Sequence, residues 1–120
     1  MTWPGLDLWR PYVGLVAWLP RDHYDPGDPH EGRPAVVIKV VAAEMVCIVV
    51  TRTSDIQCVR AGDVVHQQDT DLGCDRQGWW QPHRFCRVLF SAFDDEDVIV
   101  YKKLDDELLV RITRLYEEQL

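Results

Sequence analysis

The chain lacks the signatures of several common enzyme classes. Its 120 residues contain no Walker phosphate-binding loop, no Gly-x-Ser-x-Gly motif and no His-Glu-x-x-His motif. The sequence therefore gives no support for NTP hydrolysis, hydrolase-fold chemistry or zincin activity. No apolar run approaches the roughly 18–20 residues that cross a membrane, and the N-terminus has no basic region followed by an apolar core. We expect a single domain over residues 1–120 that acts in the cytoplasm without membrane contact.

Cysteine is scarce and unpatterned. The four cysteines (Cys47, Cys58, Cys74 and Cys86) form no C-x-x-C pair, and we expect all of them to be reduced thiols. Cys74, His83 and Cys86 are a weak zinc alternative that lacks a fourth ligand and regular spacing. We therefore expect neither a metal nor another cofactor.

Basic residues are outnumbered, with 13 Lys and Arg against 20 Asp and Glu and a formal net charge of −7. This balance argues against a general nucleic-acid coat protein, because phosphate binding depends on clustered cations. The acidic residues are unevenly distributed, however: residues 1–60 have a net charge of −1 and residues 61–120 a net charge of −6. A locally positive groove near Arg33 is compatible with this distribution.

The hydrophobic pattern predicts a mainly β protein with one C-terminal helix. Alternating or β-branched runs predict short strands at residues 12–19, 34–42, 45–53, 63–67, 79–80, 84–93 and 97–102. Residues 1–11 form an irregular lead-in, residues 21–33 a long exposed loop and residues 69–78 a polar turn. Apolar residues at helical spacing predict a helix over residues 104–120. Short strands with one terminal helix indicate a small, strongly bent sheet or SH3-like barrel.

The two strongest strand predictions flank a short connection and carry polar residues at their far ends. Residues 34–42 and 45–53 are almost continuously apolar, which indicates burial on both faces. The connection at Ala43 and Glu44 forces a hairpin. Arg33 precedes the first strand and Thr53 ends the second, so the hairpin brings a fixed cation and a hydroxyl to the same end of the sheet. This is a candidate anion or phosphate site.

Four segments in this order resemble one known family. They are residues 14–20 (GLVAWLP), residues 31–38 (EGRPAVVI), residues 53–57 (TSDIQ) and residues 104–109 (LDDELL). Over residues 12–57 and 104–120 the chain resembles the MazF/PemK-like type II toxins, which share a barrel fold with Kid and CcdB. The resemblance implies a metal-independent endoribonuclease that cleaves single-stranded RNA, forms a homodimer and is neutralised by an antitoxin protein.

By that resemblance Arg33 and Thr53 match the catalytic pair. A guanidinium donates in-plane hydrogen bonds to phosphate oxygens, and a hydroxyl donates one more to the charge that develops in the transition state. His23 and His30 in the long loop titrate near neutrality, so either is a candidate general acid or base. Glu31 is a candidate proton acceptor or a partner that orients Arg33. Ordinary structural or solvent-exposed roles remain open for all five.

Further residues are candidates for RNA binding. Arg52, Arg84 and Arg87 are placed to extend a groove along the phosphates, and Trp80 is a candidate for stacking on unpaired bases. The tryptophan has an alternative role in core or dimer packing. Five tryptophans and an apolar helix face exceed what a small barrel needs internally, which favours a homodimer.

A second function fits the same barrel. The acidic balance and the residues before the arginine (GDPHE, residues 27–31) favour a non-catalytic binding module that acts on a host or regulatory protein. For the nuclease, Arg33→Ala is expected to abolish cleavage and to leave the fold intact.

Overall fold

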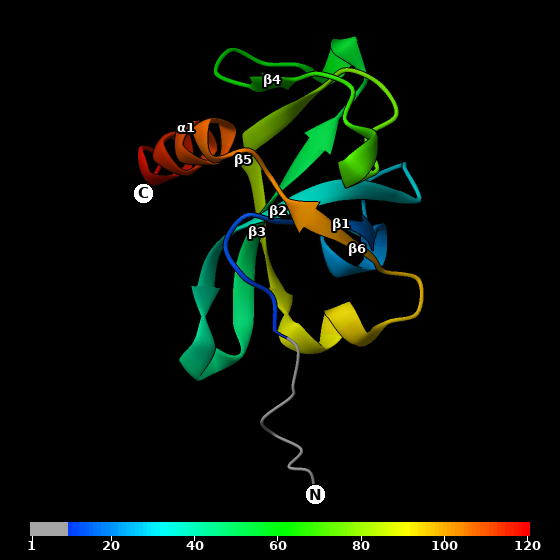
Figure 1. The fold of residues 1–120 in the computed structure, drawn as a ribbon, viewed down its shortest axis with the longest axis vertical. Helices are drawn as coiled ribbons and strands as arrows, with labels where there is room; N and C mark the ends of the chain where they lie inside the picture. Colours follow the sequence, from blue (N-terminus) through cyan, green and yellow to red (C-terminus); the bar gives the residue numbers. More distant parts are fainter. Residues whose placement is uncertain (1–9) are drawn as a thin grey trace, which may run out of the picture.

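The structure, a computed structural model, describes residues 10–120, and all but the last two residues of the expected lead-in at 1–11 lie outside that part. Figure 1 shows the order of the elements. The strands are β1 (Leu15–Pro20), β2 (Gly32–Val41), β3 (Val46–Thr53), β4 (Val64–His66), β5 (Gly78–Leu89) and β6 (Ile99–Lys103), and the α-helix is α1 (Asp106–Glu117). Short 3-10 turns lie at Arg21–His23 (η2), Ala42–Glu44 (η3), Ile56–Cys58 (η4), Thr70–Leu72 (η5) and Phe90–Asp94 (η6). Neither α1 nor any other described helix is long and apolar enough to cross a membrane.

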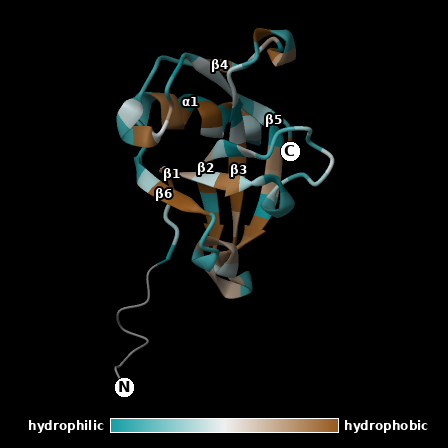
Figure 2. Ribbon diagram, turned by 90° about the vertical axis from the view of Figure 1, so that its right-hand side faces the viewer, coloured by the Kyte–Doolittle hydropathy of each residue, from teal (hydrophilic) through white to brown (hydrophobic). Residues whose placement is uncertain are grey.

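One six-stranded antiparallel sheet forms the body of the molecule, in the order β4-β5-β3-β2-β1-β6. The sheet curls into a half-barrel, and α1 covers one of its faces (Figures 1 and 2). The expected mainly β fold with a C-terminal helix is confirmed. The predicted hairpin is also present: η3 joins β2 to β3, and Met45 after it takes a left-handed conformation (φ 56°) that turns the chain.

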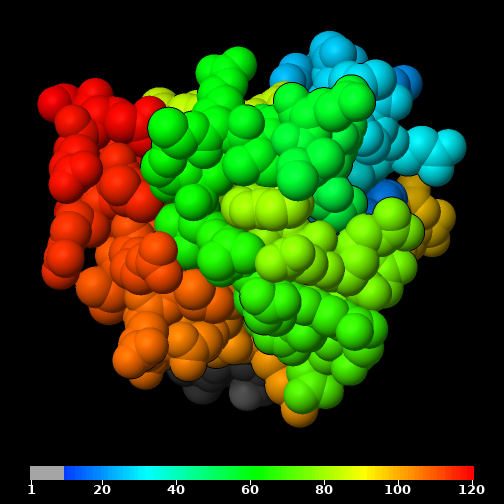
Figure 3. All heavy atoms as spheres, turned by 90° about the horizontal axis from the view of Figure 1, so that it is seen from above, coloured from blue at the N-terminus to red at the C-terminus, as the bar shows by residue number. Residues whose placement is uncertain are grey.

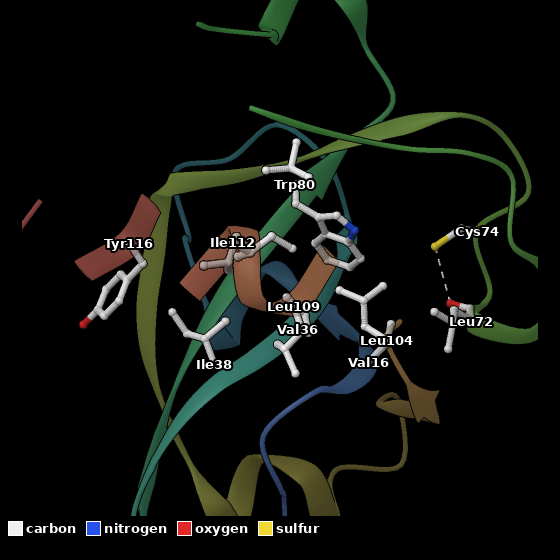
Figure 4. Packing of buried hydrophobic residues seen from close by; sticks show 12 residues of the cluster. Val16, Val36, Ile38, Leu72, Cys74, Trp80, Leu104, Leu109, Ile112 and Tyr116 are labelled. Atoms are coloured by element: carbon white, nitrogen blue, oxygen red, sulfur yellow. Dashed lines mark hydrogen bonds between the residues drawn. The ribbon is translucent and has the colours of Figure 1, made fainter. Parts of the chain in front are cut away.

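The central strands are buried on both faces, as their apolar runs predicted. Val16, Val36 and Val50 lie side by side in the sheet register and belong to the core cluster beneath α1, where Leu109 and Ile112 meet them (Figure 4). The intervening residues face the other way. They build a second buried cluster that η6 covers, with Leu15, Ala17, Leu19, Ala35, Val37, Cys47, Val49, Val88, Ala92 and Phe93 as its members.

The helix begins two residues later than the hydrophobic pattern predicted. Asp105 is its N-cap, and the Asp105 carboxylate accepts hydrogen bonds from the backbone N–H groups of Glu107 and Leu108. This satisfies two of the amide groups that have no partner within the first turn. Leu104 precedes the cap and is nevertheless buried in the core, which explains why it fitted the helical spacing.

Strand β5 corrects the prediction of two separate strands at 79–80 and 84–93. It runs unbroken through Pro82. Its register with β3 shifts there, because Trp80 pairs with Arg52 whereas Phe85 pairs with Val50. The residues between Trp80 and Phe85 form a bulge without a ladder partner on β3, and a proline, which lacks an N–H, is tolerated at such a bulge.

Candidate active site

The β2–β3 hairpin sets Arg33 and Thr53 opposite each other. Ala35 pairs with Thr51 across the two strands, and continuing this register by two residues places Arg33 opposite Thr53. Side chains two residues apart on a strand share a face, so both belong to the same face of the sheet. Both residues line one pocket of about 310 Å³. The structure thus brings the expected pair together.

Three parts of the chain build this pocket. The first part contributes Trp18, His30, Gly32, Arg33 and Pro34, the second is residues 52–55 at the end of β3, and the third is residues 73–76 before β5. In the space-filling view from above, the cyan, green and yellow-green segments meet on this face (Figure 3). Gly73 anchors the third part: its φ is +71°, and a Cβ there would lie 2.3 Å from the Tyr101 ring of β6. Only glycine fits so close to that ring.

Arg33 is held rigidly rather than solvated. Its side chain is 6% exposed, and its Nε donates to Asp28 Oδ2 at 2.8 Å. Nη2 lies 2.8 Å from His30 Nδ1, and Nη1 donates to the backbone oxygen of Arg52 at 3.3 Å. A guanidinium has five N–H donors. When Nη2 donates to His30, two of the five, one on each terminal nitrogen, have no partner within residues 10–120; when His30 Nδ1 donates to Asp28 instead, both N–H groups of Nη2 are available for an anion.

Asp28 is the centre of this arrangement. Its side chain is fully buried, and it accepts hydrogen bonds from Arg33, from Arg84 Nη2 at 3.1 Å and from the backbone N–H of His30 at 2.8 Å. Burial alone would raise the pKa of Asp28, but the bonds from Arg33 and His30 outweigh it and hold that pKa well below the usual value of 3.8. The carboxylate stays ionised, so it fixes Arg33 and does not act as a proton acceptor.

His30 Nδ1 contacts two groups that make opposite demands. It lies 2.9 Å from Asp28 Oδ1 and 2.8 Å from Arg33 Nη2. A protonated Nδ1 donates to Asp28 and leaves the Nε2 lone pair free, whereas an unprotonated Nδ1 accepts from Arg33 and places the proton on Nε2. His30 is 46% exposed and lines the pocket. Its two neutral forms therefore present either an acceptor or a donor.

Thr53 is buried, and its Oγ1 accepts a hydrogen bond from the backbone N–H of Asp55 at 3.1 Å. The hydroxyl proton has no acceptor within the described part of the chain and is free to donate. Asp55 in turn caps η4 through a bond from the N–H of Gln57. The turn after β3 thus fixes the orientation of the hydroxyl.

Two of the expected supporting residues lie outside the pocket. His23 is in η2, where its Nε2 lies 2.8 Å from Asp95 Oδ2. Glu31 is exposed, and it is not among the residues that line the pocket. The expectation that either acts on the same ligand as Arg33 finds no geometric support, because the long loop folds back and directs only His30 toward the arginine.

Of the four RNA-binding candidates, Arg52 alone lines the pocket. Trp80 is 0% exposed and packs beneath α1 (Figure 4), so the expectation that it stacks on bases is wrong and its alternative core role is correct. Arg84 forms ion pairs with Asp25 and Asp28. Arg87 is exposed and pairs with Glu44. These two arginines are not part of a groove that continues from the pocket.

No protein-family model and no curated protein matches the chain. Among solved structures, it is similar to the crystal structure of MazE–MazF from Deinococcus radiodurans, with a TM-score of 0.66 and 12% sequence identity. The match covers 93% of this chain and 96% of that one. The fold is MazF-like. The resemblance drawn from four short segments is thus confirmed for the fold.

Arg52 is a buried arginine near the end of β3. It is 4% exposed, it donates to the ring of His66 and to backbone oxygens, and its Cζ lies over the Trp80 ring, 6.0 Å from the ring centroid. Burial lowers the pKa of Arg52 from its usual value, partly offset by Cys74 and Asp69, but a guanidinium remains charged at any physiological pH. Burial likewise lowers the pKa of His66, against the opposing bond to Asp69. The imidazole is therefore neutral at pH 7.

The zinc alternative has no geometric basis. No three His, Cys, Asp or Glu side chains in the described residues are arranged to hold a metal ion. Cys74 lies in the core beneath α1, whereas Cys86 borders the cluster on the other face. All four cysteines are free thiols, and burial raises the pKa of Cys47 and Cys86 to about 12.

Sequence reasoning missed Asp28 and the pair His66 and Asp69. One signal was present for Asp28: Asp-Pro-His is an Asx-turn sequence, and the bond from the His30 N–H to the Asp28 side chain forms that turn. No local pattern marks His66 or Asp69. The contact of His66 with Arg52 depends on the pairing of β3 and β4 with β5, which joins segments distant in sequence.

Proposed function

We propose that the chain is a toxin-type, metal-independent endoribonuclease that cleaves single-stranded RNA. The observation that carries the proposal is the meeting of Arg33 and Thr53 at one pocket of a MazF-like fold. Each contributes donors that have no acceptor among the described residues. These are the groups that a phosphodiester in its transition state requires.

Cleavage without a metal uses the ribose itself. The 2′-oxygen loses its proton and attacks the adjacent phosphorus, the bond to the 5′-oxygen breaks, and that oxygen takes up a proton. The products are a 2′,3′-cyclic phosphate and a 5′-hydroxyl. The free N–H groups of Arg33 and the hydroxyl of Thr53 stabilise the charge on the non-bridging oxygens. One such preorganised donor contributes about 3 kcal/mol to transition-state stabilisation.

His30 is the residue that handles the protons. In the form whose Nδ1 donates to Asp28, its Nε2 lone pair accepts the proton of the 2′-hydroxyl, the resulting imidazolium is stabilised by the same carboxylate, and it then gives that proton to the leaving 5′-oxygen. We expect His30→Gln to lower the cleavage rate about 10²- to 10⁴-fold, with a change in unfolding free energy below about 1 kcal/mol because the side chain is half exposed. Cleavage at the wild-type rate would remove His30 from the mechanism.

The proposed toxin function also predicts the protein partners of the chain. The solved structure with a similar fold is a complex of MazE with MazF, which supports an antitoxin protein as the partner of this chain in the cytoplasm. Apolar side chains exposed on the surface, among them Phe85, Leu89 and Ile99, support a homodimer. Light scattering that finds only a 13.9 kDa species would contradict the dimer.

RNA digestion in the presence of a chelator tests the proposal. The purified chain should cut single-stranded RNA in EDTA and leave cyclic phosphate and 5′-hydroxyl ends. Thr53→Val should lower the rate, and Thr53→Ser, which keeps the hydroxyl, should retain most of it. Arg33→Ala is not expected to leave the fold intact, as the sequence suggested, since it removes an ion-pair partner of the buried Asp28. Arg33→Lys keeps the charge but loses the fork and is preferable.

One observation favours the alternative binding module. Asp28 already neutralises Arg33, and the guanidinium is almost fully buried, which lowers its attraction for a phosphate. A chain that recovers a specific protein partner, but degrades no RNA at any concentration, would select this second function.

RNA products that end in a 3′-hydroxyl would instead indicate a metal-type hydrolysis and would reject the proposed chemistry.

A further inference from the structure

Arg52 is a buried cation without a counter-ion. It is 4% exposed, and no carboxylate in the part of the chain that the structure describes forms an ion pair with it. Arg33, on the neighbouring strand β2 at the same end of the sheet, has Asp28 for this purpose. Buried charges in proteins are normally paired or bind an ion. A buried arginine that lacks a counter-ion and lines a pocket therefore indicates an anion-binding site.

Neutral acceptors hold the guanidinium of Arg52 in place. Its Nε donates to His66 Nδ1 at 3.1 Å, and its Nη2 donates to the backbone oxygens of His66 at 3.0 Å and Arg76 at 2.8 Å, with Gln67 at 3.4 Å. Nη1 is the guanidinium nitrogen with no partner within residues 10–120. The arginine therefore keeps its charge and one pair of N–H donors.

The surroundings preorganise this free end. His66 Nε2 lies 3.1 Å from Asp69 Oδ2. With its proton on Nε2, the ring offers Nδ1 to Arg52 as an acceptor, so the carboxylate fixes the tautomer that the arginine needs. Gly78 leaves space for the guanidinium, because a Cβ there would lie 2.5 Å from Nη1. Nη1 thus lies against Gly78, and Arg76, whose backbone oxygen accepts from Nη2, lines the pocket together with Arg52.

We propose that Arg52 is a phosphate-binding residue of the pocket, with Nη1 as the donor. Arg52 lines the pocket together with Arg33 and Thr53. Because successive strand residues point to opposite faces, Arg52 and Thr53 serve different anions. In an RNA strand these are the scissile phosphate at Thr53 and a neighbouring phosphate at Arg52. Only the naming of RNA as the source rests on the proposed function; the anion site itself does not.

Titration with inorganic phosphate tests the site without any cleavage. NMR spectra of ¹⁵N-labelled wild-type protein, recorded at constant ionic strength against sodium chloride, should show a saturable shift of the Arg52 Nε–H resonance. Arg52→Met should weaken phosphate binding at least tenfold. Arg87→Met is the matched control, since it removes the same charge from an exposed arginine outside the pocket, and it should bind phosphate as the wild type does.

A second arm identifies the source. With a single-stranded DNA oligonucleotide, which lacks the 2′-hydroxyl and is not cleaved, Arg52→Met should reduce the slope of log K against log salt by about 0.7, the value for one phosphate on a single strand. An unchanged slope with an intact phosphate effect would assign the site to a free phosphate rather than a nucleic acid. That result would overturn the RNA assignment and keep the anion site.

The result that overturns the proposal is an Arg52 Nε–H resonance that phosphate does not move, or a folded Arg52→Met variant that binds phosphate like the wild type. Should Arg52→Met fail to fold, the wild-type titration still decides. The two proposals can fail separately. RNA cleavage that requires Thr53, in a protein whose Arg52 does not bind phosphate, would support the nuclease and reject the phosphate site at Arg52.

Discussion

Asp28 is the residue whose replacement most directly tests the geometry of the candidate site. Asp28→Asn keeps the shape of the side chain but removes the charge that faces Arg33 Nε and Arg84 Nη2. The amide oxygen still accepts a hydrogen bond, but the amide NH₂ group cannot accept one from either arginine. Arg33 then remains buried without a counter-ion, which is the costly half of breaking a buried pair.

The expected loss in unfolding free energy is about 3 kcal/mol. Removing one partner of a buried ion pair costs roughly 3–5 kcal/mol, and the lower end applies because Arg84 keeps Asp25 as a partner at 3.0 Å. For a domain of this length, such a loss lowers the melting temperature by about 10–15 °C. Asp25→Asn is the control: Asp25 is 46% exposed, and its loss should cost less than about 1 kcal/mol.

Urea unfolding at pH 7 and pH 3 measures both the size and the origin of the effect. The folded protein holds the pKa of Asp28 below the usual 3.8, so its stabilisation is present above that value and is lost as the pH falls below it. The gap between wild type and Asp28→Asn should therefore narrow at pH 3. A variant within about 1 kcal/mol of wild type at pH 7, or a gap independent of pH, would refute the reasoning.

Three further outcomes follow from the structure. Thr53→Val should lower the cleavage rate about 10²-fold or more, while Thr53→Ser retains it; equal rates for Val and Ser would contradict the donor role. Because burial lowers the pKa of His66, the wild type should lose stability as the pH falls below about 6.5, and urea unfolding of His66→Gln from pH 7.5 to 5 should show a flatter dependence. Trp80→Phe should cost no more than about 2 kcal/mol of unfolding free energy. The indole N–H is buried without a partner in the described residues, so its removal offsets part of the lost packing. A much larger loss, measured by calorimetry, would contradict this and show that the N–H has a hydrogen-bond partner.

The hydrophobic pattern predicted most of the fold because the strands and the helix are local features. The β-branched runs of β2 and β3 imply burial on both faces, and both faces are in fact covered. The polar cap and apolar spacing located α1. The pattern failed at Pro82, because whether a proline ends a strand or occupies a bulge depends on the partner strand, and that partner is distant in sequence.

By itself, the sequence determined that Arg33 and Thr53 meet, since a hairpin with a short connection leaves its two far ends at the same place. Tertiary structure alone decided what surrounds them. It set Asp28 against Arg33, left Arg52 without a counter-ion and enclosed Trp80 in the core. These outcomes depend on desolvation and on contacts between segments far apart in the chain, and neither leaves a periodic trace in the order of residues.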